Sequence, residues 1–271
     1  MDQPVRENIG LIAGAGEVPR YFARKAKDAG IPIVSIAFTP EIQSTLDPFV
    51  EKSLCIGIGK VDKIFKTLKQ EQISDLMILG KVDKGIIFRP QMFDLRTLKF
   101  LKNLRSKDDK TLMEGVIDEL EKEGFRLLDQ REFMPEIFPS SGVLTRRSPD
   151  SEEMKDIEYG LPAARKIADM EIGQTLVVRN QVVVAVEGVE GTDRAIARGC
   201  ELARGSAVVV KVSRTNQDYR YDSPGIGLKT MQCLIDGKAS ALALEAGRVM
   251  ILEQEQVVAL AEKNKISIIC V

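Results

Sequence analysis

The sequence contains no histidine and no tryptophan among its 271 residues. The absence of histidine excludes Ser–His and Cys–His nucleophilic catalysis, histidine-ligated zinc and a histidine general base. Any acid–base chemistry must therefore come from carboxylates, lysine, tyrosine, cysteine or a metal-bound water. A chain of this length suffices for one large or two small domains, each with a buried core.

The chain also lacks a basic excess and long apolar runs. Its 39 Lys and Arg residues are balanced by 40 Asp and Glu residues, giving a net charge of -1. A general nucleic-acid binder usually carries a clear surplus of positive charge, so we expect no nucleic-acid partner. No apolar stretch approaches the roughly 18 residues of a membrane span, and the N-terminus has no signal-peptide pattern. We therefore expect a cytoplasmic protein.

The four cysteines are scattered and form no CxxC motif: Cys55, Cys200, Cys233 and Cys270. Such a pattern is typical of a reducing compartment, where cysteines stay as thiols. Free cysteine is among the most frequently buried residue types. We therefore expect four buried free thiols rather than a disulfide framework or a zinc site.

The first 90 residues alternate short apolar runs with amphipathic segments. The pattern predicts strands at 9–13, 31–38, 53–56 and 75–79, and helices at 18–29 and 61–70. Strands that alternate with helices predict a parallel sheet with right-handed crossovers. Glycine turns fall at the ends of three of these strands, and open parallel sheets bind ligands outside the carboxyl ends of their strands.

Residues 94–124 are predicted to be helical, as one long helix or as two helices broken near 106–109. Leucines recur at a spacing of three, at Leu95, Leu98, Leu101 and Leu104, and five basic residues crowd the same stretch: Lys99, Lys102, Arg105, Lys107 and Lys110. The leucines either pack into the core beneath a solvated basic face, or form with the basic residues a surface for an anionic lipid or a bilayer. The sequence leaves both interpretations open.

The segment 135–149 is rich in proline, serine and threonine and is predicted to be a linker. It separates a first domain at 1–134 from a second α/β domain at 150–271. Asp150 and Glu153 fit the capping box of a helix that starts the second domain. The apolar runs at 175–178 and 182–186 flank Arg179-Asn180-Gln181 and predict a hairpin.

A glycine-rich turn follows the first predicted strand. Gly14 and Gly16 would let backbone N–H groups approach a phosphate at a helix N-terminus. The dinucleotide fingerprint requires glycine where Pro19 stands, which argues against a nicotinamide-dependent oxidoreductase. Gly80 and Lys81 form a second such turn at the end of another strand. Phosphate binding and ordinary strand–helix connections both stay open for these turns.

Two polar segments of the second domain could carry chemistry. Glu187–Asp193 (EGVEGTD) joins a strand to a helix, where Thr192 fits the N-cap and Asp193 the first turn. Its three carboxylates also suit a metal such as magnesium. The long loop 211–227 places Lys211, Arg214 and Arg220 near Asp218 and Asp222. Cations that hold phosphates, beside carboxylates that hold a metal or orient water, are what phosphoester hydrolysis needs.

Six segments together resemble a known family, in matching order and spacing along nearly the whole chain: GLIAGAGEVP at 10–19, SKDD at 106–109 followed by DELEKEGF at 118–125, IGQ at 172–174, AVEG and EGTD within 185–193, RYDSPGIG at 220–227 and EAGR at 245–248. In this combination the chain is similar to the LpxI-type UDP-2,3-diacylglucosamine pyrophosphatases of lipid A biosynthesis in Gram-negative bacteria. The resemblance implies a Rossmann-like N-terminal domain and a distinct C-terminal catalytic α/β domain, with the active site between them.

The resemblance also implies a reaction. Water attacks the phosphorus on the sugar side of UDP-2,3-diacylglucosamine, giving UMP and 2,3-diacylglucosamine 1-phosphate (lipid X), with magnesium or another divalent cation. The family's catalytic aspartate matches Asp222, as a metal ligand or as a water-orienting base. Asp193 and Asp218 are additional candidate metal ligands. The residues expected to contact the substrate are Gly14, Gly16, Gly80, Gln174, Thr192, Asp193, Lys211 and Arg220.

Three expectations about partners follow from the same resemblance. The substrate and lipid X are the small-molecule partners, and the family implies a homodimer. Peripheral contact with the inner-membrane surface would suit a lipid substrate and the leucine-rich, basic stretch near residue 100. The alternative function is a non-catalytic binder or carrier of a nucleotide-sugar or of an acylated sugar phosphate, since binding and hydrolysis would use the same groups.

Overall fold

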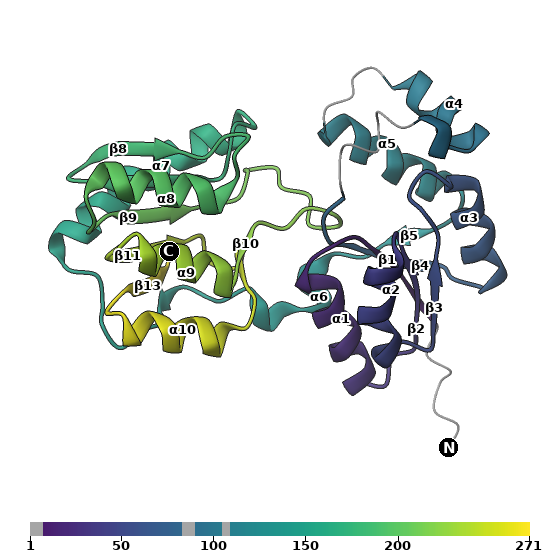
Figure 1. The fold of residues 1–271 in the computed structure, drawn as a ribbon, viewed down its shortest axis with the longest axis horizontal. Coiled ribbons are helices and arrows are strands. Elements are labelled where there is room, and N and C mark those ends of the chain that lie inside the picture. Colours follow the sequence, from purple (N-terminus) through teal and green to yellow (C-terminus); the bar gives the residue numbers. More distant parts are fainter. Residues whose placement is uncertain (1–7, 83–89, 105–108) are drawn as a thin grey trace. The chain divides into compact units, whose positions relative to one another are not determined.

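The computed structural model describes residues 8–82, 90–104 and 109–271 (Figure 1). The chain divides into two compact units, Met1–Phe133 and Met134–Val271, each with its own sheet. This confirms the predicted α/β fold with two distinct domains. Residues 135–149, expected to be a linker, contain the 3-10 helix η4 (Pro135–Ile137) and the strand β6 (Gly142–Val143), which pairs with the last strand of the second unit.

The first unit is built on a five-stranded parallel sheet in the order β3-β2-β1-β4-β5. Its strands are β1 (Ile9–Ala13), β2 (Ile33–Ala37), β3 (Lys52–Cys55), β4 (Asp75–Leu79) and β5 (Arg126–Leu127). β1 and β2 are buried along their whole length, as expected for strands covered on both faces. The strand order changes direction between β1 and β4, which makes their carboxyl ends the switch point of the sheet.

The helices of the first unit connect and cover these strands. They are α1 (Glu17–Asp28), α2 (Pro40–Leu46), α3 (Val61–Gln70), α4 (Leu95–Asn103), α5 (Asp109–Lys122) and α6 (Gln130–Phe133), with 3-10 turns η1 (Asp47–Phe49) and η3 (Pro90–Met92). The predicted helical stretch 94–124 is therefore two helices. Residues 106–108 of the SKDD segment, with Arg105 and Lys107, lie outside the described residues.

The second unit contains a mixed six-stranded sheet in the order β6-β13-β11-β9-β7-β8. Its strands besides β6 are β7 (Thr175–Arg179), β8 (Val182–Val186), β9 (Val208–Lys211), β11 (Ala241–Leu244) and β13 (Ser267–Cys270). β9, β11 and β13 run parallel, whereas β7 is antiparallel to both β8 and β9. A separate two-stranded sheet joins β10 (Gly225–Ile226) to β12 (Met250–Ile251).

Helices cover both faces of this sheet. α7 (Ser151–Asp169) packs on one face, and α8 (Thr192–Ala203), α9 (Leu228–Asp236) and α10 (Gln254–Lys263) pack on the other. Val208 and Val210 of β9 contribute to the core under α7, while Val209 contributes to the opposite core. This alternation is the period-two pattern of a strand buried on both sides.

Two local predictions for the second unit are confirmed. The Asp150 side chain accepts the N–H of Glu153, and the Glu153 carboxylate accepts the N–H of Asp150 at 2.8 Å, so the capping box starts α7. The β7–β8 hairpin turns through Asn180 and Gln181, whose φ angles are 51° and 59°. Both turn N–H groups donate to the buried carboxylate of Asp156 on α7.

The expectation of four buried thiols is wrong for Cys233, which is only partly buried, and for Cys55, which is exposed on β3. β3 lies at the edge of its sheet and has no fully buried residue, so its side chains reach solvent. Cys200 and Cys270 are buried, and burial raises the pKa of each thiol to about 11. All four cysteines are free.

Candidate active site

The strand register of the second unit brings four separate segments to one edge of its sheet. Thr175 at the start of β7 pairs with Lys211 at the end of β9, and Leu244 at the end of β11 is level with Lys211. The N–H of Glu187, just after β8, donates to the Thr175 carbonyl at 2.9 Å. β7 runs antiparallel to its two neighbours, so its first residue lies at the same edge as the last residues of β8, β9 and β11.

Lys211 is a buried cation at this edge. Its side chain is 5% exposed, and its Nζ donates to the hydroxyl oxygens of Thr175 at 3.0 Å and Thr192 at 2.9 Å. The Glu187 carboxylate lies 3.7 Å from the same Nζ. Burial by itself raises the pKa of Glu187, but the Lys211 charge and the surrounding hydrogen bonds outweigh it and hold the pKa below its ordinary value.

The predicted capping role of Thr192 is wrong. The N-cap of α8 is Gly191, with a φ of 82°, and Thr192 is the first residue of the helix. A hydroxyl at that position no longer faces the helix N–H groups. Instead, Thr192 donates to Glu187 at 2.8 Å and accepts from Lys211, so it lies beside another candidate residue.

Asp222 lies in the loop that follows β9, and its carboxylate is already paired. The guanidinium of Arg214 donates to Oδ2, and the Gln217 amide donates to the same oxygen at 2.8 Å. Gln217 also accepts from the Arg214 backbone N–H at 3.3 Å. The Asp222 side chain is nevertheless 42% exposed, so a ligand from solvent can reach it.

Gln174 connects these two groups of residues. Its backbone N–H donates to Glu187 at 3.2 Å, and its side-chain amide donates to the Oε1 atom of Gln217 at 2.9 Å. A continuous series of hydrogen bonds therefore runs from the buried Lys211 to the exposed Asp222. Gln174, Thr192, Lys211 and Asp222, which the sequence singled out individually, lie in one network.

The base of the loop is held by residues whose role the sequence analysis did not identify. Glu245, directly after β11, accepts the N–H of Ser213 at 2.9 Å and its hydroxyl at 3.0 Å, and pairs with Arg165 of α7. Arg248 donates to the Ser213 hydroxyl at 2.7 Å and to the Arg214 carbonyl at 2.5 Å. The EAGR segment at 245–248 contributes to the family resemblance, but only the fold shows that it anchors the loop that carries Asp222.

Asp193, Asp218 and Arg220 make other contacts. Asp193 accepts from the Thr230 hydroxyl at 2.9 Å and pairs with Lys229 of α9 at 3.2 Å. Asp218 pairs with Arg220 at 2.7 Å. Burial acts to raise the pKa of Asp218, but its hydrogen bonds with Arg220 and the Arg220 charge keep it below the ordinary value.

The acidic side chains therefore offer a limited set of metal ligands. Asp222, Asp193 and Asp218 each pair with a different basic residue. Across residues 8–82, 90–104 and 109–271, no three acidic or cysteine side chains gather closely enough to hold a metal ion. In this arrangement the three aspartates do not form a self-sufficient magnesium site.

The glycine turns lie in the first unit, at its switch point. The Gly14 N–H donates to the Leu79 carbonyl at 2.8 Å, and Ala15 and Lys81 form an antiparallel bridge. A Cβ on Gly14 would lie 2.5 Å from the Lys81 carbonyl oxygen, so the two turns need glycine for close backbone contact. The Gly14 N–H is thus used within the protein, and Gly80, with a φ of 91°, contacts the Gly14 backbone.

Gly16 differs from these two residues. It is the N-cap of α1, with a φ of 112°, no side-chain cap, and open space where a Cβ would stand. A helix N-terminus that carries no side-chain cap favours an anion there. Of the three predicted phosphate-binding glycines, Gly16 therefore has the geometry closest to that role.

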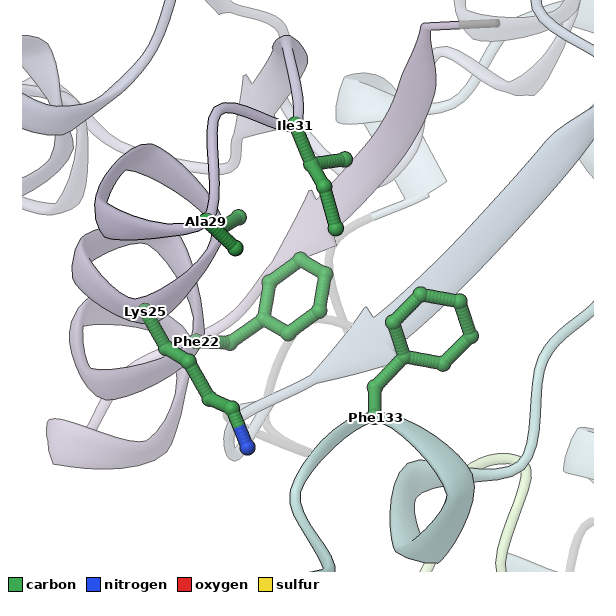
Figure 2. A pocket seen from close by; sticks show the side chains of 6 residues that line it. Phe22, Lys25, Ala29, Ile31 and Phe133 are labelled. Atoms are coloured by element: carbon green, nitrogen blue, oxygen red, sulfur yellow. The ribbon is translucent and has the colours of Figure 1, made fainter. Parts of the chain in front are cut away.

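The first unit also contains a small apolar hollow, lined by Phe22, Lys25, Ala26, Ala29, Ile31 and Phe133. Figure 2 shows the rings of Phe22 and Phe133 beside each other, and they form an edge-to-face pair with centroids 6.2 Å apart. The hollow has no carboxylate in its lining and a single cation, Lys25. It is therefore unsuited to hydrolysis.

No helix among the described residues is both long enough and apolar enough to span a bilayer. This agrees with the absence of long apolar runs in the sequence.

Comparison with known proteins identifies both units. The N-terminal domain model of the LpxI family matches residues 8–137, and its C-terminal domain model matches residues 140–269. The protein named UDP-2,3-diacylglucosamine pyrophosphatase LpxI from Caulobacter vibrioides is 35% identical in an alignment of length 267 that covers 94% of this chain and 94% of that protein.

Solved structures give only distant likenesses. Glycinamide-RNase-transformylase T from Mycobacterium tuberculosis is 13% identical with a TM-score of 0.26, covering 66% of this chain and 44% of the other. The biotin carboxylase domain of 2-oxoglutarate carboxylase from Hydrogenobacter thermophilus is 16% identical with a TM-score of 0.25, covering 62% and 34%. These likenesses are too weak to bear on function. The family models and the Caulobacter relative extend over both units, and the chain therefore belongs to the LpxI family.

Proposed function

We propose that this protein hydrolyses the pyrophosphate bond of UDP-2,3-diacylglucosamine, releasing UMP and 2,3-diacylglucosamine 1-phosphate. The observation that carries the proposal is the identity of 35% along 94% of both chains with a relative that bears the name of this activity. Both family domain models match the chain, so the proposal does not depend on one shared domain.

The network from Lys211 to Asp222 is our candidate for the catalytic machinery. A pyrophosphate is strongly anionic, and its hydrolysis needs cations to neutralise charge that develops as the bridging P–O bond breaks. Arg214 supplies a cation beside the partly exposed Asp222 carboxylate, and Lys211 supplies a buried cation at the other end of the same network. Both lie at one edge of the sheet, on backbone fixed by strand pairing and by the Glu245 contacts.

In the proposed reaction, Asp222 orients a water molecule and takes its proton as the water attacks the sugar-side phosphorus. The bond between that phosphorus and the bridging oxygen breaks, and UMP leaves with the bridging oxygen. Arg214 donates to the same carboxylate and would become a phosphate ligand when substrate binds. This exchange of partners would free the Asp222 oxygen for water.

Magnesium dependence stays a prediction from the family resemblance. The acidic residues that the structure describes do not make a metal site by themselves. Location in the cytoplasm at the inner-membrane surface, and assembly as a homodimer, are further proposals that suit a lipid substrate and the family.

The deciding experiment measures UMP release from UDP-2,3-diacylglucosamine in mixed detergent micelles. Asp222→Asn should lower kcat about 1000-fold, the contribution typical of a general base. Asp236→Asn, at the exposed end of α9, is the matched control and should retain full activity. Wild-type protein that binds the substrate but releases no UMP would favour the carrier function instead.

Mass spectrometry of the purified proteins adds a second readout. Intact UDP-diacylglucosamine bound to Asp222→Ala, with lipid X or no lipid on the wild type, would support both the substrate and the residue. Intact substrate on both proteins would contradict hydrolysis. Lipid X on both would show that Asp222 is not essential.

A further inference from the structure

Helix α4 presents a face that the fold of the first unit leaves uncovered. Leu95 is 86% exposed and Leu98 is 41% exposed, while Lys99 and Lys102 are also exposed. These four residues follow the spacing i, i+3, i+4 and i+7, so they lie on one side of the helix. We call them the outer face of α4.

The opposite side of α4 is firmly attached to the unit. Arg96 pairs with Glu123, just after α5, at 2.5 Å, and the Thr97 hydroxyl donates to the Gly59 carbonyl at 2.9 Å. A Cβ on Gly115 of α5 would lie 3.1 Å from the ring of Phe100, so α4 and α5 are in close contact (Figure 1). The outer face is therefore held outward by packing on the inner side.

The start of the helix is fixed as well. The Asp94 side chain caps α4 by accepting the Thr97 N–H at 2.8 Å, and its second oxygen accepts the N–H of Asp62 at 2.9 Å. The Asp94 N–H donates to the Gly59 carbonyl. Leu95 is the next residue, so its exposed side chain belongs to an ordered helix start.

The composition of the outer face indicates its partner. It combines two leucines with two lysines and has no acidic residue. Within the part of the chain that the structure describes, neither lysine forms an ion pair. Met92, just before the helix, adds another exposed apolar side chain, 42% exposed. Apolar side chains flanked by lysines suit the interface of an anionic bilayer, where leucines enter the acyl boundary and lysines reach the headgroups.

We propose that the outer face of α4 docks the protein on an anionic membrane surface. The choice of a bilayer rests on the proposed function, since a diacylated substrate resides in a membrane. Docking would bring the enzyme to its substrate without a spanning helix. Core packing and lipid binding, the two interpretations of the four leucines, then each apply to two of them. Leu101 and Leu104 are partly buried, and Leu95 and Leu98 are exposed.

The test is sedimentation of the full-length protein with vesicles of phosphatidylcholine containing phosphatidylglycerol, compared with phosphatidylcholine alone. Wild-type protein should bind the anionic vesicles preferentially, and less so at high salt. Lys99→Gln with Lys102→Gln should weaken binding about fivefold for each lysine removed. Leu95→Ser with Leu98→Ser should weaken it about tenfold for each leucine.

Matched controls make the same changes elsewhere. Lys166→Gln with Lys263→Gln removes two exposed lysines of the second unit, and Leu202→Ser removes an exposed leucine. Both controls should bind as the wild type does. Equal binding by the α4 variants and the wild type, or no binding of the wild type to anionic vesicles, would overturn the proposal.

Two further measurements distinguish membrane docking from a role in catalysis and from self-association of the chain. UMP release in detergent micelles should be unchanged in the α4 variants, so failure of docking and failure of the proposed function give different results. Sedimentation velocity without lipid should also be unchanged. A loss of self-association in the leucine variant, with vesicle binding retained, would assign the face to a contact between copies of the chain and refute membrane docking.

Discussion

Arg214 and Asp222 form a hydrogen-bonded ion pair in the loop that follows β9. The carboxylate that we propose to activate water is thus paired with a guanidinium. The pair keeps the Asp222 side chain oriented, and it places a cation where an incoming pyrophosphate would be attracted.

We expect Arg214 to be needed for both binding and turnover. Arg214→Ala should raise KM and lower kcat by about 100-fold, because a charge-stabilising group is removed from the transition state. Arg214→Lys keeps the charge but loses the planar fork, and should recover only part of this loss. Steady-state kinetics in micelles measure both parameters. Unchanged kcat in Arg214→Ala would refute a role in the chemical step.

Gln174 is hydrogen-bonded to Gln217, so substitutions at these two residues should have non-additive effects on kcat. Gln174→Ala and Gln217→Ala should each lower kcat about tenfold, because each breaks the same connection to Asp222. The double variant should be little worse than either single one. Gln232→Ala, on the exposed side of α9, is the control. Fully additive effects would show that the two glutamines act independently.

The stability contributed by Glu187 should depend on pH. Its pKa in the folded protein lies below the ordinary 4.5, so its stabilising effect is complete above that value and is lost as the pH falls through the lowered folded pKa. Glu187→Gln should cost about 3 kcal/mol at pH 7, because Lys211 is left buried without a charge partner.

Urea unfolding at pH 7, 5, 4 and 3 measures this difference. The gap in free energy of unfolding between wild type and Glu187→Gln should be largest near neutral pH and should shrink as the pH falls below 4.5, as expected from linkage. A gap that widens on acidification would contradict the lowered pKa of Glu187.

Magnesium should act together with the substrate. Treatment with EDTA should abolish UMP release, and added magnesium should restore it. Magnesium alone should leave Tm unchanged, since the described residues offer no cluster of three acidic ligands. Magnesium with UMP should raise Tm, because this ion is usually bound by one or two carboxylates plus phosphate oxygens. A large shift with magnesium alone would reveal a protein site that the present arrangement lacks.

Local sequence signals predicted much of the fold correctly. The apolar runs located β1, β2 and β4, the capping box at Asp150 located the start of α7, and the Arg179-Asn180-Gln181 turn located a hairpin. These features depend on residues close together in sequence, so local chemistry is enough to specify them. Thr192 shows the limit, because Gly191 with a positive φ takes the cap position and the threonine turns to Lys211.

The sequence alone determined the family, the two-domain α/β composition and the absence of histidine chemistry. It also supplied the carboxylates and cations of the candidate site. Only the tertiary structure decided which of them meet. The pairing of β7, β8, β9 and β11 brings Gln174, Glu187, Lys211 and Glu245 to one edge, although they span 72 positions of the chain from 174 to 245. Such contacts arise from strand register and burial, which no local pattern encodes.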